Sequence, residues 1–219
     1  MKNEVRGIRD LINQGEGIHL DFKHSINDAK KIARSLSAFA NTDGGSLLIG
    51  VRDNGSIAGI SSEEEYYMME TASLLYCKPP VKFNHKTWII DGKTILEIIV
   101  AKSEDSPHYS PDQNNDYKAF IRVNDENFIA HKILVDVWKR GKSSTQGVKL
   151  VYDKNVELIL KEISLNGSIS KSQLTRITGI KSQKADRLLT NMMLMEILNY
   201  RISDNITEFV FHKNYNLEK

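Results

Sequence analysis

Four side chains near the start of one expected helix have the chemistry to contact a nucleic acid. They are Lys181, Gln183, Lys184 and Arg187. Lysine and arginine neutralise phosphates, and arginine and glutamine can pair with base edges in the major groove. The same residues also suit a solvated face or a protein contact, so their meaning depends on the elements that position them.

Two helices and a tight turn are expected just before these residues. The apolar spacing from Val156 to Ile163 predicts a first helix, which Asn166-Gly167 ends. Ser170 and Gln173 have the spacing of a capping box, which predicts the start of a short second helix. Thr178-Gly179 is then expected to form the turn that leads into the helix with the four polar residues.

A third helix and a hairpin complete this pattern. From about Ser182, one helical face is apolar, with Ala185, Leu188, Leu189 and Met192. The segments 198–202 and 207–211 alternate apolar and polar residues around Asp204-Asn205, which predicts a hairpin. Three helices followed by a hairpin are typical of a winged helix-turn-helix, in which the third helix reads DNA from its amino-terminal end. We therefore expect such a domain at 151–219.

Composition separates this region from the rest of the chain. The whole chain has a net charge of +2, but residues from Lys139 onward contain fourteen Lys and Arg against eight Asp and Glu. The basic region is the expected binder of a polyanion. Apolar periodicity stops at KRGKSSTQG, 139–147, so we expect a first domain at 1–140 and a linker at 141–150.

The first domain is expected to mix helices with strands, which gives an α+β fold overall. Helices are predicted at 27–41 and 62–75, and strands at 46–51, 88–90, 94–100 and 120–123. Asn54-Gly55 and Asp91-Gly92 are expected hairpin turns, the first of them leading into 57–60. The polar segment 106–116 is predicted to be a mobile surface loop.

Two glycines precede the first buried strand. Gly44-Gly45 could expose backbone N–H groups to a phosphate, or could let a helix pack closely on the strand. The surrounding residues resemble a known domain. FANTDGGSLLIGVRDNGSIAGI, at Phe39 to Ile60, together with GEGIHLDFK, at Gly15 to Lys23, is similar to the Schlafen/AlbA-type domain. In bacteria, this resemblance implies a protein that joins the domain to a winged helix and regulates transcription.

The resemblance also implies an alternative activity. Some Schlafen relatives are metal-dependent endoribonucleases that cut tRNA-like RNA, and their three acidic residues correspond here to Glu16, Asp21 and Asp53. Three carboxylates on one Mg²⁺ or Mn²⁺ would polarise a phosphate and activate water. Lys23 would hold a phosphate. Asp21 replaces the usual glutamate with a shorter side chain, and the single copy of the domain would require a homodimer.

Other chemistry has little support in the sequence. Gly92-Lys93-Thr94 and Gly141-Lys142-Ser143 lack the first glycine of a Walker A loop, so ATP hydrolysis is not expected. The six histidines are scattered, Cys77 is the single cysteine, and no cofactor is indicated. No segment has the apolar length of a membrane span, and we expect a cytoplasmic protein.

The sequence thus predicts a DNA-binding protein, expected to be a transcriptional regulator and a homodimer. A metal-dependent ribonuclease acting on structured RNA is the alternative from a different class. A winged helix that serves only protein interaction is a third possibility, because winged helices are reused in that way.

Overall fold

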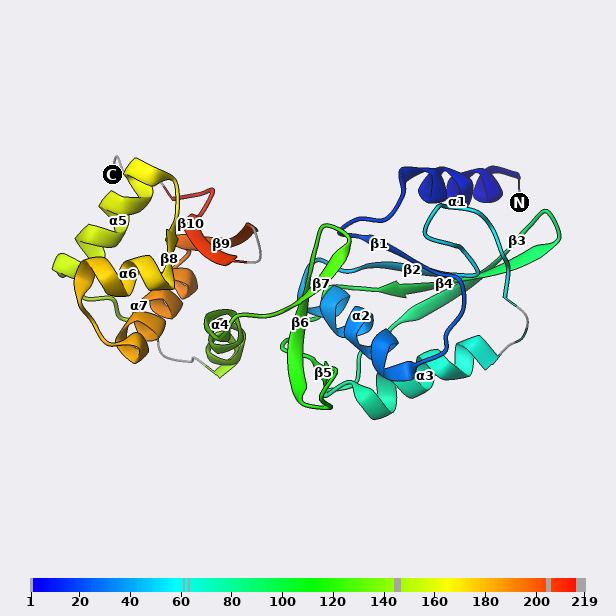
Figure 1. The fold of residues 1–219 in the computed structure, drawn as a ribbon, viewed down its shortest axis with the longest axis horizontal. Coiled ribbons are helices and arrows are strands. Elements are labelled where there is room, and N and C mark those ends of the chain that lie inside the picture. The colour runs from blue at the N-terminus through cyan, green and yellow to red at the C-terminus, as the bar shows by residue number, and fades with distance from the viewer. Residues whose placement is uncertain (1, 61, 63, 144–146, 204–205, 216–219) are drawn as a thin grey trace. The chain divides into compact units, whose positions relative to one another are not determined.

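The structure is a computed structural model that describes residues 2–60, 62, 64–143, 147–203 and 206–215 (Figure 1). The chain forms two compact units, 1–130 and 131–219. The boundary between them lies earlier than the expected 140. The reason is α4, Lys132–Ser143, an unpredicted helix that contains the start of the expected linker at 141–150 and packs within the second unit. Residues 144–146 of that linker lie outside the described residues.

A mixed sheet forms the centre of the first unit. Its strand order is β1-β2-β4-β3, with bounds Leu20–Lys23, Gly45–Ile49, Lys93–Val100 and Asn84–Ile90. β1 is parallel to β2, whereas the other neighbours are antiparallel. The hairpin predicted at Asp91-Gly92 is confirmed. The hairpin expected after Asn54-Gly55 is reduced to one bridge between Val51 and Ile57.

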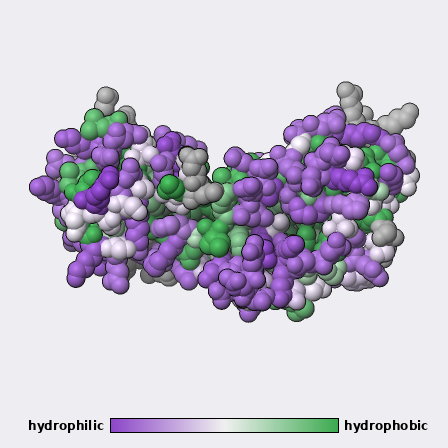
Figure 2. All heavy atoms as spheres, in the orientation of Figure 1, coloured by the Kyte–Doolittle hydropathy of each residue, from purple (hydrophilic) through white to green (hydrophobic). Residues whose placement is uncertain are grey.

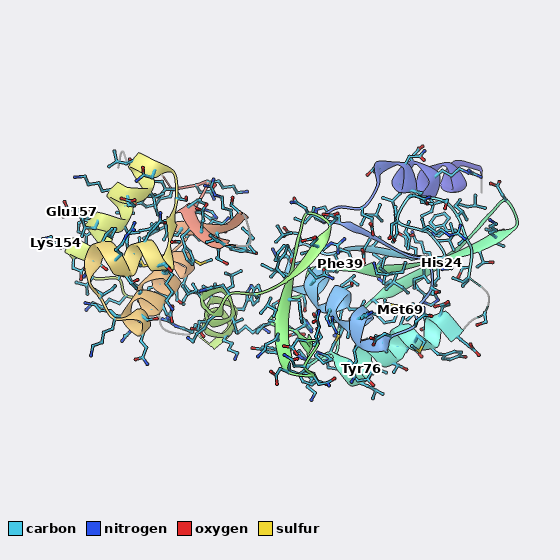
Figure 3. All side chains as sticks on the ribbon, in the orientation of Figure 1. His24, Phe39, Met69, Tyr76, Lys154 and Glu157 are labelled. Carbon is cyan, nitrogen blue, oxygen red and sulfur yellow. The ribbon has the colours of Figure 1, made fainter. Side chains whose placement is uncertain are left out.

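Helices cover both faces of this sheet (Figure 1). α1, Lys2–Gln14, packs on one face, whereas α2, Ala29–Asn41, and α3, Glu64–Tyr76, pack on the other. Leu48 faces α1, and Leu47 and Ile49 face the two other helices. Because both faces of β2 are buried, its residues 47–49 form an uninterrupted apolar sequence. Phe39 and Met69 lie on the α2 and α3 side (Figure 3).

A second sheet packs on α2 and overturns the prediction of a mobile loop at 106–116. It contains β5, Tyr109–Pro111, β6, Tyr117–Val123, and β7, Glu126–Ile129. His108 and Ser110 are buried, and Ser110 Oγ lies 2.9 Å from Ser37 Oγ of α2. The segment is polar in sequence, but long-range hydrogen bonds engage the buried His108 and Ser110.

The second unit has its own core. α4, α5, Lys154–Asn166, α6, Lys171–Thr178, and α7, Ser182–Leu194, surround buried residues such as Leu189 and Phe209. β8, Ile169–Ser170, β10, Ile206–Phe211, and β9, Leu198–Ser203, form an antiparallel sheet in that order. The three predicted helices and both hairpin strands are present, while the predicted turn at Asp204-Asn205 lies outside the described residues.

The face seen in Figure 2 is largely hydrophilic, with some patches of hydrophobic residues. Among the described helices, none combines the length and the apolar character that crossing a membrane requires.

Candidate nucleic-acid-binding sites

Asp21 is a buried carboxylate in β1. Its neighbours Leu20 and Phe22 pack in the cluster with α1, so alternation along the strand turns Asp21 to the opposite face, toward α2. One oxygen, Oδ1, lies 3.2 Å from Arg122 Nη2. The other, Oδ2, lies 2.9 Å from Lys23 Nζ and accepts a 3.4 Å hydrogen bond from Ser35 Oγ. Both oxygens are therefore engaged by side chains of this unit.

Arg122, in β6, is the central cation of this cluster, and its side chain is only 2% exposed. Its guanidinium donates hydrogen bonds of 3.1 to 3.2 Å to Gly17 O, Leu20 O, Asp21 Oδ1 and Asn127 Oδ1. It also lies over the Phe39 ring, 5.3 Å from the centroid. Arg122 is not among the site residues that the sequence predicts. An arginine inside the apolar run AFIRV is the signal that could have pointed to a buried, paired charge.

Glu16 lies beside Asp21. Its Oε1 accepts a 2.7 Å hydrogen bond from the Phe22 backbone N–H. Burial is the main cause that raises the pKa of Glu16, and the nearby Asp21 carboxylate raises the pKa further, while the Phe22 N–H acts in the opposite direction. The structure therefore brings together two of the three acidic residues that the resemblance singled out.

Asp53 does not join them. It is exposed in the turn that follows Val51, where Asn54 Oδ1 accepts from the Ser56 N–H and Gly55 adopts a φ of 78°. Throughout the described part of the chain, no group of three His, Cys, Asp or Glu side chains is placed to hold a metal ion. The expected Mg²⁺ or Mn²⁺ set of Glu16, Asp21 and Asp53 is therefore not assembled, because Asp21 is held by cations and Asp53 faces outward.

A cavity of about 620 Å³ opens beside the Asp21 cluster. Its basic lining residues are Lys23, Lys31, Arg34 and Arg122, and its acidic ones are Asp21, Asp112 and Asp125. Lys23 is the residue expected to hold a phosphate. Its Nζ, however, already pairs with Asp21 and donates to Phe22 O at 2.7 Å. The cavity is therefore only weakly positive, and most of its charges neutralise one another.

The two glycines serve packing. Gly44 has a φ of 76° and its N–H donates to Phe39 O at 2.9 Å, so this N–H is not free for a phosphate. A Cβ at Gly45 would lie 2.5 Å from the Phe39 ring and 2.8 Å from His19 O. Of the two roles considered for Gly44-Gly45, close helix-to-strand approach is the one that the contacts support.

The four polar residues of the second unit lie together at the start of α7. The capping box of Ser170 and Gln173 is present in α6, and Gly179 ends that helix with a φ of 69°. Lys181 is the N-cap of α7 and makes no side-chain capping bond. The exposed residues include Lys181, Gln183, Lys184 and Arg187, whereas Ala185, Leu189 and Met192 are buried. A basic, uncapped helix start is a favourable place for an anion.

An ion pair fixes α7 against α6. Lys171 Nζ, in the first turn of α6, lies 2.5 Å from Asp186 Oδ1 of α7, and both residues are largely withdrawn from solvent. Because Asp186 faces inward, Lys184 and Arg187 are directed to the outer side of the helix. The second unit contains fifteen Lys and Arg against nine Asp and Glu, a net charge of +6.

The chain resembles known proteins, and one family matches most of its first unit. The family described as Schlafen, AlbA_2 matches residues 16–131, more than half of the chain. Among solved structures, the DIP2311 protein from Corynebacterium diphtheriae shares 19% identity at a TM-score of 0.44. That match covers 73% of this chain, which spans only 32% of that protein. The N-terminal domain of a RecG-related protein from Nitrosomonas europaea shares 18% identity at a TM-score of 0.41, over 68% of this chain and 95% of that domain. By its family match, the chain belongs to the Schlafen AlbA_2 family.

Proposed function

We propose that this chain binds double-stranded DNA and acts in transcriptional control. Residues 131–219 would form a winged helix in which α7 enters the major groove. The observation that carries the proposal is the set of exposed polar side chains at the uncapped start of α7: Lys181, Gln183, Lys184 and Arg187.

The dimensions and charge of the second unit support this assignment. With its 13 residues, α7 is about 20 Å long, and an α-helix fits the major groove of B-DNA. The +6 charge of the unit favours attraction to phosphates. The β9 and β10 pair would supply the wing, and its Arg201 is oriented by Glu208 at 2.8 Å.

The first unit would act as a second surface or in dimerisation. Its cavity offers Lys31 and Arg34 to a phosphate, although Arg34 Nε also donates to Pro111 O at 2.9 Å. A homodimer would present two copies of α7 to the two halves of a palindromic site. In this proposal the protein is cytoplasmic and binds DNA there.

The ribonuclease alternative has weaker support. It requires three carboxylates around a metal ion, and only Glu16 and Asp21 approach each other. The protein-interaction alternative would use the same surface of α7, so a DNA-binding measurement separates it from the leading proposal.

The experiment is fluorescence anisotropy with labelled duplex DNA and the full chain. Replacing Lys184 and Arg187 together with Ala should weaken binding at least about tenfold, because each interaction with a base or phosphate contributes about 1 kcal/mol or more. The matched control replaces Lys154 and Lys161, two exposed lysines on α5, with Ala (Lys154 is labelled in Figure 3). Equal affinities of the two double variants would contradict the assignment of α7.

A further inference from the structure

The outer face of α3 is apolar. Tyr67, Leu74 and Leu75 are 61%, 64% and 63% exposed. The opposite face of the same helix is also apolar, because Met69 and Ala72 are buried in the core beneath it. α3 therefore has apolar residues on both sides.

A helix at the surface of a globular protein ordinarily turns charged residues to water. α2, the neighbour of α3, does so with Lys31, which is exposed, while Lys30 and Arg34 are half-buried. On α3, the exposed apolar residues fall at i, i+7 and i+8, so they lie on one side of the helix. Exposed apolar residues that line one side of a surface helix mark a candidate interaction surface.

Opposite charges stand near the two ends of the stripe. Glu64, in the first turn of α3, and Lys78, just after its last turn, are both exposed. Each stands seven positions along the sequence from Thr71, and Lys78 lies two residues beyond Tyr76, the last residue of α3, where its backbone pairs with Tyr109. Lys78 Nζ rests 4.0 Å from the centroid of the Tyr117 ring, which holds the ammonium group near the end of α3.

We propose that a second copy of this chain docks on this face, with α3 antiparallel to α3 of the partner about a two-fold axis at Thr71. Glu64 then meets Lys78 of the partner subunit, and Lys78 meets Glu64 of the partner subunit. Along the same register, Tyr67 packs on Leu75 of the partner subunit. The inference does not depend on DNA binding.

A second copy fits this face because the face is complementary to itself. In a two-fold interface each contact occurs twice, so a surface with an acidic end, an apolar centre and a basic end pairs with its own inverted copy. One pair of 13-residue helices provides less than a standard interface. The dimer is therefore expected to dissociate in the micromolar range.

Sedimentation velocity of the full chain tests the dimer, at concentrations from about 1 to 200 µM. The wild type should shift from monomer to dimer across this range. Leu75→Asp should raise the dissociation constant at least about tenfold, because it places a charge in the apolar centre. Leu165→Asp, at a residue of α5 that is 71% exposed, should leave the dissociation constant unchanged. A wild type that stays monomeric throughout, or equal effects of the two variants, would overturn the proposal.

A charge swap tests the antiparallel register on residues whose replacement leaves the core intact. Glu64→Lys and Lys78→Glu should each weaken the dimer, because each brings like charges together twice. The variant with both substitutions should recover the wild-type dissociation constant. If the dissociation constant of the double variant is as high as those of the single variants, the antiparallel pairing about Thr71 is wrong.

Discussion

Arg122 and Lys23 neutralise the same carboxylate, but their environments differ. The Arg122 side chain is 2% exposed and that of Lys23 is 36% exposed, while Asp21 between them is 5% exposed. We expect Arg122→Met to destabilise the first unit strongly. The substitution keeps much of the side-chain volume but leaves a buried carboxylate with one partially solvated cation.

The expected magnitude follows from these interactions. Removing one partner of a buried ion pair costs about 3 to 5 kcal/mol. Arg122→Met also leaves the carbonyls of Gly17 and Leu20 without this donor. Because Lys23 still lies 2.9 Å from Asp21, the lower end of the range applies. At about 3 °C for each kcal/mol, the melting temperature of the unit should fall by about 10 °C. Lys23→Met should cost at most about 1 kcal/mol, because the pair that it breaks is partly solvated.

Urea denaturation followed by circular dichroism measures both variants, and Trp88 fluorescence follows the first unit in a background in which Trp138 of the second unit is replaced with Phe. Trp88 belongs to β3, in the first unit. The double variant with Asp21→Asn and Arg122→Met should lose less free energy of unfolding than the sum of the two single losses, because Asp21→Asn removes the unpaired charge. The reasoning would be refuted if Arg122→Met cost no more than Lys23→Met, or if the two losses in the double variant were additive.

Three further predictions concern single residues. The raised pKa of Glu16 means that the contribution of this residue to stability becomes less favourable as pH rises above 4.5, the ordinary value, toward the folded-state pKa. Glu16→Gln should therefore raise the melting temperature at pH 7 and not at pH 4, and a constant difference at all pH values would argue against it. Gly44→Ala should destabilise the first unit by about 1 to 3 kcal/mol in urea, since φ is positive there. Its Cβ would also lie 2.7 Å from Val100 O, and a neutral result would mean that the backbone can shift. Ser170→Ala should cost the second unit about 1 kcal/mol because it removes the capping box, and an unchanged midpoint would show that the cap is dispensable.

Local signals in the sequence are reliable in the second unit. The capping box at Ser170 and Gln173 and the glycines at Gly167 and Gly179 act within one turn of chain, so a short segment contains all the relevant information. The turn between β6 and β7, in the first unit, is not among the predicted turns, although one of its residues favours it. Asn124 adopts a φ of 53°, a left-handed conformation that asparagine tolerates better than most residues.

Long-range partners are not predictable from the sequence. Asp21 and Arg122 are 101 residues apart, so their pairing is visible only in the folded chain. His108 lies in a segment whose composition predicts a polar loop, yet its ring nitrogens lie 2.8 Å from Pro79 O and 2.7 Å from Ser103 Oγ. Basic residues and Gly141 predict a linker at the end of α4, whereas packing of Ile133 in the second core stabilises the segment as a helix. In each case tertiary contacts outweigh the local composition.

The candidate acidic site shows the limit of a resemblance. The matched motif correctly places Glu16 and Asp21 near each other, but it does not show that Arg122 and Lys23 occupy the oxygens of Asp21. Family membership therefore establishes the domain and leaves its chemistry to the neighbouring side chains.

The salt dependence of DNA binding tests the central claim most directly. For the full chain on duplex DNA, the logarithm of the binding constant should fall linearly with the logarithm of the salt concentration. If Lys184 and Arg187 bind phosphates, replacing both with Ala should reduce the magnitude of this slope by about 1.8, or about 0.9 for each phosphate that is no longer neutralised. An unchanged slope, with the same affinity as the wild type, would contradict DNA binding through α7.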